Sequence, residues 1–190
     1  LRRRGLLKFG DIWDIPCFAA LYHWGLLDYR VVVRRALKAW RGKTVSELVE
    51  EGRMCVDGDI RPRLRTPLVE LLRDLREQQV EPVLMSASPH ELLRHLAADL
   101  GVELLATRLS VTDDRFTGEV EGERCYGAGK LRILNDHLDR RGLERGRTLV
   151  LGDSISDRPL LETARLPVAV APDPRLRSWA RRNAILLWDI

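Results

Sequence analysis

From residue 66 onward, short apolar runs alternate with longer stretches in which apolar residues recur at helical spacing. Runs such as 149–151 and 168–171 have the length of strands buried on both faces. The segment 109–122 instead predicts a hairpin, with its turn at residues 112–115. The predicted order is therefore helix, strand, helix, hairpin, helix, strand, helix, strand, helix, strand. This alternation indicates an α/β fold, a Rossmann-like, mostly parallel sheet with helices on both faces.

The first 65 residues show no strand-like alternation. Their apolar positions follow helical spacing, Gly25 and Gly42 interrupt the pattern, and Thr44 to Glu47 (TVSE) has the spacing of a capping box. We therefore expect an all-helical domain over residues 1–65 and an α/β core domain over residues 66–190. The tryptophans of the first part are expected to be packing anchors rather than a binding box: Trp13, Trp24 and Trp40.

Composition narrows the classes of protein. The 190 residues are 45% hydrophobic and 32% charged, as in a folded globular chain, and no apolar run approaches the ~20 residues of a membrane span. Without a signal-peptide pattern we expect a cytoplasmic protein. The net charge of +4 comes from arginines scattered among acidic residues, so no nucleic-acid partner is expected. Widely spaced Cys17, Cys55 and Cys125 predict neither a zinc site nor a disulfide framework.

The most informative stretch is Thr148 to Asp157, which reads TLVLGDSISD. A buried strand is followed at once by Asp153 and Asp157, and residues just past the carboxyl end of a strand face the ligand crevice of an open α/β sheet. Two carboxylates beside small polar residues suit Mg²⁺. The alternative is an ordinary turn into a helix, with Asp153 or Ser154 as its N-cap.

Two further segments offer phosphate-binding chemistry. Ser86 follows a predicted strand at 80–85 and precedes a helix, so its hydroxyl and backbone N–H groups such as that of Ala87 could bind an anion. Alternatively, Ser88 and Pro89 only cap that helix. Lys130 lies at a predicted helix start in GAGK, where the helix dipole disfavours a cation, which favours a functional role. The segment does not have P-loop spacing.

With these residues placed, the chain resembles the haloacid dehalogenase superfamily of hydrolases, in its phosphoserine-phosphatase-like branch (subfamily IB). Ser86 in VLMSASP resembles the second family motif, Lys130 in GAGKLRIL the third, and GDSISD the fourth. The hairpin phrase RLSVTDDRFTGEVEGE is also similar to that branch. The resemblance implies that Ser86 holds a phosphate oxygen, Lys130 neutralises nucleophile and phosphate, Asp153 binds Mg²⁺ and Asp157 supports the metal site. It also implies that the helical domain is a cap.

One family motif has no counterpart. The first motif, DxD, should end the first core strand and precede the cap, but only LRRRGLLKFG stands there. Asp11 and Asp14 lie in a helical pattern, while Asp57 and Asp59 have the right spacing but are expected in a loop. Because that strand normally lies at the sheet centre, two neighbouring strands should expose unpaired edges. We expect an upstream segment of the parent to be missing; the alternative is a variant that lives without it.

The resemblance implies a Mg²⁺-dependent phosphatase that hydrolyses a small phosphomonoester, a phosphorylated metabolite, through an aspartyl-phosphate intermediate. The alternative is a catalytically inactive module that binds phosphate and metal but lacks the nucleophile. Cap residues would select the substrate in the first case.

Overall fold

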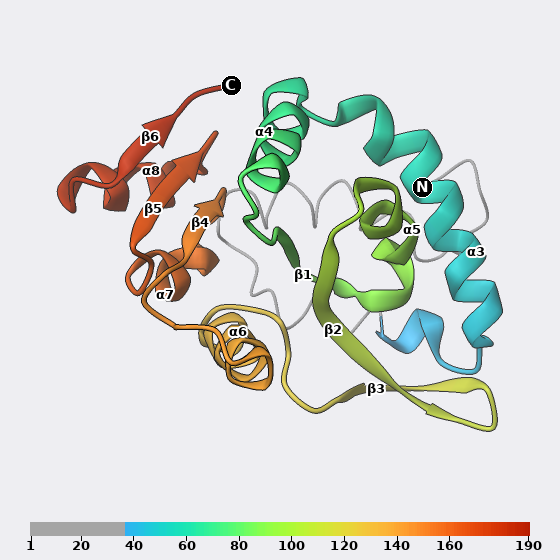
Figure 1. The fold of residues 1–190 in the computed structure, drawn as a ribbon. Helices are drawn as coiled ribbons and strands as arrows, with labels where there is room; N and C mark the ends of the chain where they lie inside the picture. Colours follow the sequence, from blue (N-terminus) through green and yellow to red (C-terminus); the bar gives the residue numbers. More distant parts are fainter. Residues whose placement is uncertain (1–36) are drawn as a thin grey trace.

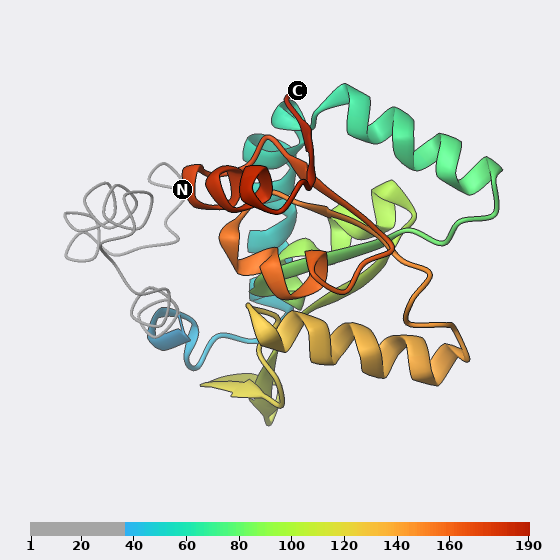
Figure 2. The same cartoon turned by 90° about the vertical axis from the view of Figure 1, so that its left-hand side faces the viewer.

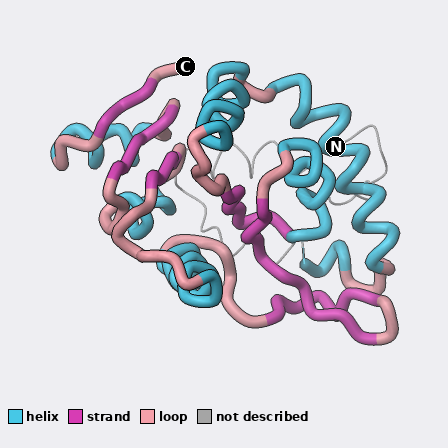
Figure 3. The backbone as a smooth tube through the Cα atoms, in the orientation of Figure 1, coloured by secondary structure: helices cyan, strands magenta, loops and turns pink. Residues whose placement is uncertain are grey.

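The computed structural model of the chain describes residues 37–190 (Figure 1). Predictions that concern Trp13, Trp24, Asp11, Asp14 and Cys17 lie outside the described residues. Figure 3 shows the alternation of helix and strand predicted from residue 66 onward. The strands are β1 (Val83–Pro89), β2 (Glu103–Thr112), β3 (Arg115–Glu121), β4 (Leu149–Gly152), β5 (Leu166–Val170) and β6 (Leu186–Trp188).

Helices precede the strands and connect most of them. They are α3 (Val45–Cys55), α4 (Thr66–Glu77), α5 (His90–Leu100), α6 (Ala128–Arg141), α7 (Arg158–Leu161) and α8 (Pro174–Arg182). Between β1 and β2, α5 makes the crossover and packs on both strands, while α7 and α8 pack against the strands β4 and β5 (Figure 2). The fold is thus mixed α/β, with parallel strands flanked by helices, as predicted.

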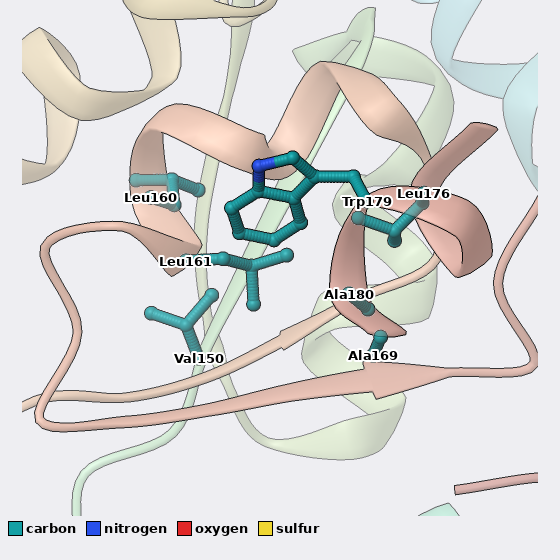
Figure 4. Close-up of a cluster of buried hydrophobic side chains, with 7 residues drawn as sticks. All are labelled: Val150, Leu160, Leu161, Ala169, Leu176, Trp179 and Ala180. Carbon is teal, nitrogen blue, oxygen red and sulfur yellow. The ribbon is translucent and has the colours of Figure 1, made fainter. Parts of the chain in front are cut away.

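The largest buried cluster lies between β4, β5 and the helices α7 and α8. Its fully buried members include Leu161, Leu176 and Ala169, and Trp179 covers them from α8 (Figure 4). Met85 of β1 also packs against this cluster. Because β1 belongs to the other sheet, Met85 connects the two sheets through this cluster.

The described strands form two sheets rather than one. Their orders are β1-β2-β3 and β4-β5-β6, so within residues 37–190 both β1 and β4 have a neighbour on one side only. Parallel strands are normally covered on both faces and paired on both sides. Here Leu151 of β4 is 37% exposed, although it stands at the centre of an apolar strand. The sheet is therefore interrupted between β1 and β4, where unpaired edges were expected.

The helix before the α/β region is anchored to it by apolar contacts. The predicted capping box is present at α3, where Thr44 and Glu47 satisfy each other's backbone N–H groups. Leu48 of α3 packs with Leu109 and Phe116 of the hairpin, and Trp40 packs against the same cluster. For Trp40 this agrees with the role of a packing anchor. The domain boundary at residue 65 remains a prediction.

The predicted loop at Asp57 and Asp59 is wrong. A single π-helical segment, η2 (Val56–Ile60), continues α3 instead. The continuation places Asp57 four residues from both Arg53 and Arg61, and ion pairs at this spacing stabilise helices.

The contacts of the first sheet set the ends of the elements around it. Thr66 is the first residue of α4, and no side chain caps that helix. The strand predicted at 80–85 is β1, which extends to Pro89 because its register with β2 continues, after a shift, to a pairing of Pro89 with Thr107. The first arm of the predicted hairpin belongs to the longer strand β2, which has an irregularity in its pairing to β3. Within the described part of the chain, no helix is long and apolar enough to cross a membrane.

Candidate active site

The acidic turn at the end of β4 is organised around the buried carboxylate of Asp157. One of its oxygens accepts a hydrogen bond from the backbone N–H of Asp153 at 3.3 Å. A Cβ at Gly152 would lie 2.9 Å from the Cβ of Asp157, so only glycine allows this close approach. Ser154, not Asp153, caps the following turn η4 (Ile155–Asp157), and its hydroxyl accepts from Ser156 N–H at 3.2 Å. The turn thus has the capping geometry of an ordinary turn into a helix, and it also leaves Asp153 exposed at the end of β4.

Lys130 reaches the same turn from the first residues of α6. Its Nζ donates to Oδ1 of Asp157 at 2.6 Å, and both residues are buried. The helix start is fixed by Gly129, where a Cβ would lie 2.0 Å from the carbonyl oxygen of Arg124. The predicted conflict between a cation and the helix dipole is therefore offset by a buried carboxylate.

Asp153 remains partly open to solvent, while the protein behind it desolvates the carboxylate. Burial, and next the negative charge of Asp157, raise the pKa of Asp153 above its usual value, while Lys130 acts in the opposite direction. Both oxygens of Asp157 are engaged by Lys130 and by the N–H of Asp153. Asp153 is therefore the carboxylate of this pair that is available to a cation.

Ser86 is joined to this group through Cys125. The backbone N–H of Cys125 donates to the Thr107 hydroxyl at 3.2 Å, and that hydroxyl donates to the carbonyl oxygen of Ala87, the neighbour of Ser86. The Cys125 Sγ donates to the carbonyl oxygen of Leu105 at 3.3 Å. Burial raises the pKa of Cys125, while Lys130 and Asp157 lie near enough for their charges to act on it in opposite directions. Strand β1, the segment before α6, and the β4 turn thus converge at one edge, the carboxyl ends of β1 and β4.

The hydroxyl of Ser86 faces the last residues of β1. It accepts from Ser88 N–H at 3.2 Å, and the carbonyl oxygen of Ala87 accepts from the Thr107 hydroxyl at 3.1 Å. Ser88 and Pro89 do not cap α5 with a side chain. The helix begins at His90, and no side-chain hydrogen bond caps it.

Sequence reasoning missed two residues that organise the site. Asp173 accepts from Ile155 N–H at 2.9 Å and from Leu176 N–H at 2.7 Å, so it holds the acidic turn while it caps α8. Its position directly before Pro174 was the available signal. Cys125 was weighed only for disulfide and zinc chemistry, and no local pattern indicated its link to Ser86.

The only DxD spacing in the chain lies away from this edge. Arg61 binds Asp57 at 3.1 Å and Asp99 at 2.6 Å. Asp99 stands near the end of α5, whereas β1 and the site lie at its beginning, about 15 Å of helix away. Asp57 and Asp59 are therefore excluded as reacting groups of this site. Among residues 37–190 there is also no cluster of three or more acidic, histidine or cysteine side chains placed to hold a metal ion.

An α/β protein with a hydroxyl, a buried ammonium and an acidic turn at the carboxyl edge of its sheet has the parts of an anion- and cation-binding site. The sequence matches the haloacid dehalogenase-like hydrolase family over residues 1–162. The chain belongs to this family, as its motifs predicted.

Curated relatives carry phosphatase names. The chain is 34% identical to phosphoserine phosphatase SerB1 of Mycobacterium tuberculosis over 158 residues, which are 83% of this chain and 50% of that protein. It is 36% identical to a probable phosphatase of the same organism, Rv3661, over 181 residues, 95% of this chain and 62% of that protein. The chain therefore spans about half to two-thirds of the length of these relatives.

Solved structures agree with the fold. A protein of unknown function from Bordetella pertussis Tohama I aligns with a TM-score of 0.87 at 25% identity, over 98% of this chain and 86% of that one. A substrate-bound phosphoserine phosphatase aligns with a TM-score of 0.67 at 18% identity, over 94% and 80% of the two chains. At that identity the second likeness concerns the fold alone.

Proposed function

We propose that this chain forms the core of a Mg²⁺-dependent phosphatase that acts on a small phosphomonoester in the cytoplasm. The observation that supports this most strongly is the buried contact between Lys130 and Asp157 beside Asp153, with Ser86 linked to the same edge through Cys125. The group offers an ammonium and a hydroxyl for phosphate oxygens and a carboxylate for the metal.

The carboxylate of Asp153 suits Mg²⁺. Mg²⁺ in phosphate-binding sites is held by one or two carboxylates, substrate oxygens and water. Asp153 is a partly desolvated carboxylate with a raised pKa, so a divalent cation would offset the cost of its charge. Mg²⁺ would supply charge neutralisation of the phosphoryl group. In this proposal Asp157 supports the metal site by orienting Lys130 and the Asp153 backbone.

In the proposed reaction a carboxylate attacks phosphorus, the bond to the leaving oxygen breaks, and water then hydrolyses the aspartyl-phosphate. Lys130 neutralises charge on the phosphoryl oxygens, while the Ser86 hydroxyl and the N–H of Ala87 hold them in place. We propose that the nucleophile enters on a strand between β1 and β4. Within the described residues each of these strands has a neighbour on one side only.

A second candidate is a module that binds phosphate and metal without turnover. It is favoured by the finding that, of the two DxD-spaced aspartates in the described part, neither lies at the site. The test is a screen of phosphomonoesters with the protein expressed from its complete gene, with Mg²⁺ and with EDTA. Phosphate release that requires Mg²⁺ supports the phosphatase; binding of phosphate without release on any ester supports the module.

A further inference from the structure

A second feature beside the site gathers positively charged side chains. A hollow of about 700 Å³ lies between the helical turn at residues 37–41 and the strand β3. The described residues of its walls include three cations, Lys38, Arg41 and Arg124, and one carboxylate, that of Glu119. We call it the basic hollow. Its volume falls within the range of small-molecule sites.

The three cations have no acidic partner within residues 37–190, unlike their neighbours. Glu123, next to Arg124, is bound by Arg132 through two hydrogen bonds, at 2.8 and 2.9 Å. Lys43, close to Arg41 in sequence, forms an ion pair with Glu51. Glu123 and Glu51 are thus committed elsewhere, so among the described residues the basic hollow sets three cations against Glu119, and this excess of positive charge attracts anions.

The position of Arg41 depends on a glycine. A Cβ at Gly118, whose φ is +86°, would lie 3.2 Å from the Cβ of Arg41. The side-chain stem of Arg41 therefore lies across the backbone of β3, close to the irregularity in the pairing of β2 and β3. Irregular pairing of this kind is common beside functional sites because it redirects side chains.

The basic hollow lies on the same side of the sheet as the candidate active site. Pro89, at the end of β1, pairs with Thr107, so the rest of β2 and the hairpin project beyond the carboxyl edge. From β3 the chain runs through Arg124 and Cys125 to Lys130 in a few residues. Cys125, the neighbour of Arg124, is linked through the Thr107 hydroxyl to Ala87, next to Ser86.

We infer that the basic hollow binds a second anionic group, a carboxylate or phosphate, carried by the phosphomonoester substrate. This inference rests on the proposed phosphatase function. Lys38, Arg41 and Arg124 then act as specificity residues: they hold the far end of the substrate while its phosphoryl group lies at Ser86 and Lys130. Phosphate esters without a second anionic group would contact only Ser86 and Lys130.

The test compares pairs of esters that differ in one charge: 3-phosphoglycerate with glycerol 3-phosphate, and 6-phosphogluconate with sorbitol 6-phosphate. With the protein expressed from its complete gene, kcat/KM should be at least about fivefold higher for the acid in one pair, the size of one exposed charge pair. The preference should lie in KM and weaken as salt is added. The double substitution of Arg41→Gln and Arg124→Gln should remove this preference for the acid. It should leave kcat/KM for the esters without a carboxylate unchanged.

Arg145→Gln is the matched control, because that arginine is exposed after α6, is paired with Asp139 and does not line the basic hollow. It should keep the preference. Equal turnover of acid and neutral ester in both pairs, or an unchanged preference in the double variant, overturns the inference while the phosphatase stands. If no ester is hydrolysed, the proposed phosphatase function fails, and binding of the same esters is then measured by calorimetry. Tighter binding of the acids that depends on Arg41 and Arg124 supports an anion site in the basic hollow. Equal binding of the acid and of its partner without a carboxylate overturns it.

Discussion

Lys130 Nζ lies 2.6 Å from Oδ1 of Asp157, and the two side chains are only 11% and 7% exposed. They come from the start of α6 and the turn after β4, 27 residues apart. This contact ties the two segments that bear the candidate catalytic groups, so it supports both the fold and the site. Removing one partner of a buried ion pair leaves an uncompensated charge.

Lys130→Met should therefore lower the free energy of unfolding by about 3–5 kcal/mol. Urea unfolding followed by circular dichroism measures the change. Adding Asp157→Asn to Lys130→Met should recover part of the loss, because no buried charge then remains. Arg132→Met, which breaks an exposed pair with Glu123, should cost about 1 kcal/mol or less. Similar losses at positions 130 and 132 would show that the buried pair has no special role.

Gly152→Ala tests the close packing of the acidic turn. The added Cβ would meet the Cβ of Asp157 at 2.9 Å, which displaces the carboxylate that holds Lys130 and the N–H of Asp153. We expect a loss of about 1–3 kcal/mol in unfolding free energy. Gly146→Ala is the control, because nothing lies within 4 Å of its Cβ position. A tolerated alanine at 152 would mean that the turn is looser than the structure has it.

His90, at the first turn of α5, predicts a dependence of stability on pH. Burial lowers the pKa of His90; Arg108 and Arg94 act in the same direction, and Glu91 opposes them. The folded state therefore favours the neutral imidazole, so this contribution is present above the unfolded pKa of about 6.5 and is lost as pH falls through the folded pKa. The unfolding free energy of the wild type should fall more steeply between pH 7.5 and 5 than that of His90→Gln. Parallel pH curves would refute the assignment.

The core between β4, β5 and the helices α7 and α8 gives a stability prediction independent of the site. Leu161 is 1% exposed beneath Trp179, so Leu161→Ala should cost about 2–5 kcal/mol through lost burial and a cavity (Figure 4). Leu166→Ala, at a position 52% exposed on β5, should change the unfolding free energy by about 0.5 kcal/mol or less. Equal effects of the two substitutions in thermal or urea unfolding would contradict this core.

The sequence allowed prediction where a signal is local. The alternation of strands and helices, the hairpin and the capping box at Thr44 all follow from the spacing of neighbouring residues, and the structure confirms them. The motif resemblance also identified the family, which the comparison over residues 1–162 confirms.

Part of what failed depends on partners distant in the chain. The strand β1 runs on to Pro89 because β2 offers it a partner, which no pattern within residues 80–89 shows. A loop was expected at Asp57 and Asp59 because no apolar strand leads into them and Pro62 follows closely, but arginines four residues away favour a helical continuation. The link from Cys125 to Ser86 needs three-dimensional contact, so a single sequence without aligned relatives could not reveal it.

The most direct test of the account is the Mg²⁺ dependence of phosphate release from a phosphomonoester by the protein expressed from its complete gene, beside its Asp153→Asn variant. The wild type should release phosphate with Mg²⁺ and stop when EDTA removes it. Asp153→Asn should reduce the Mg²⁺-dependent rate by about a hundredfold or more, the loss expected for a principal charge-stabilising group. Full Mg²⁺-dependent activity in Asp153→Asn would contradict the account, because the metal would then be held elsewhere.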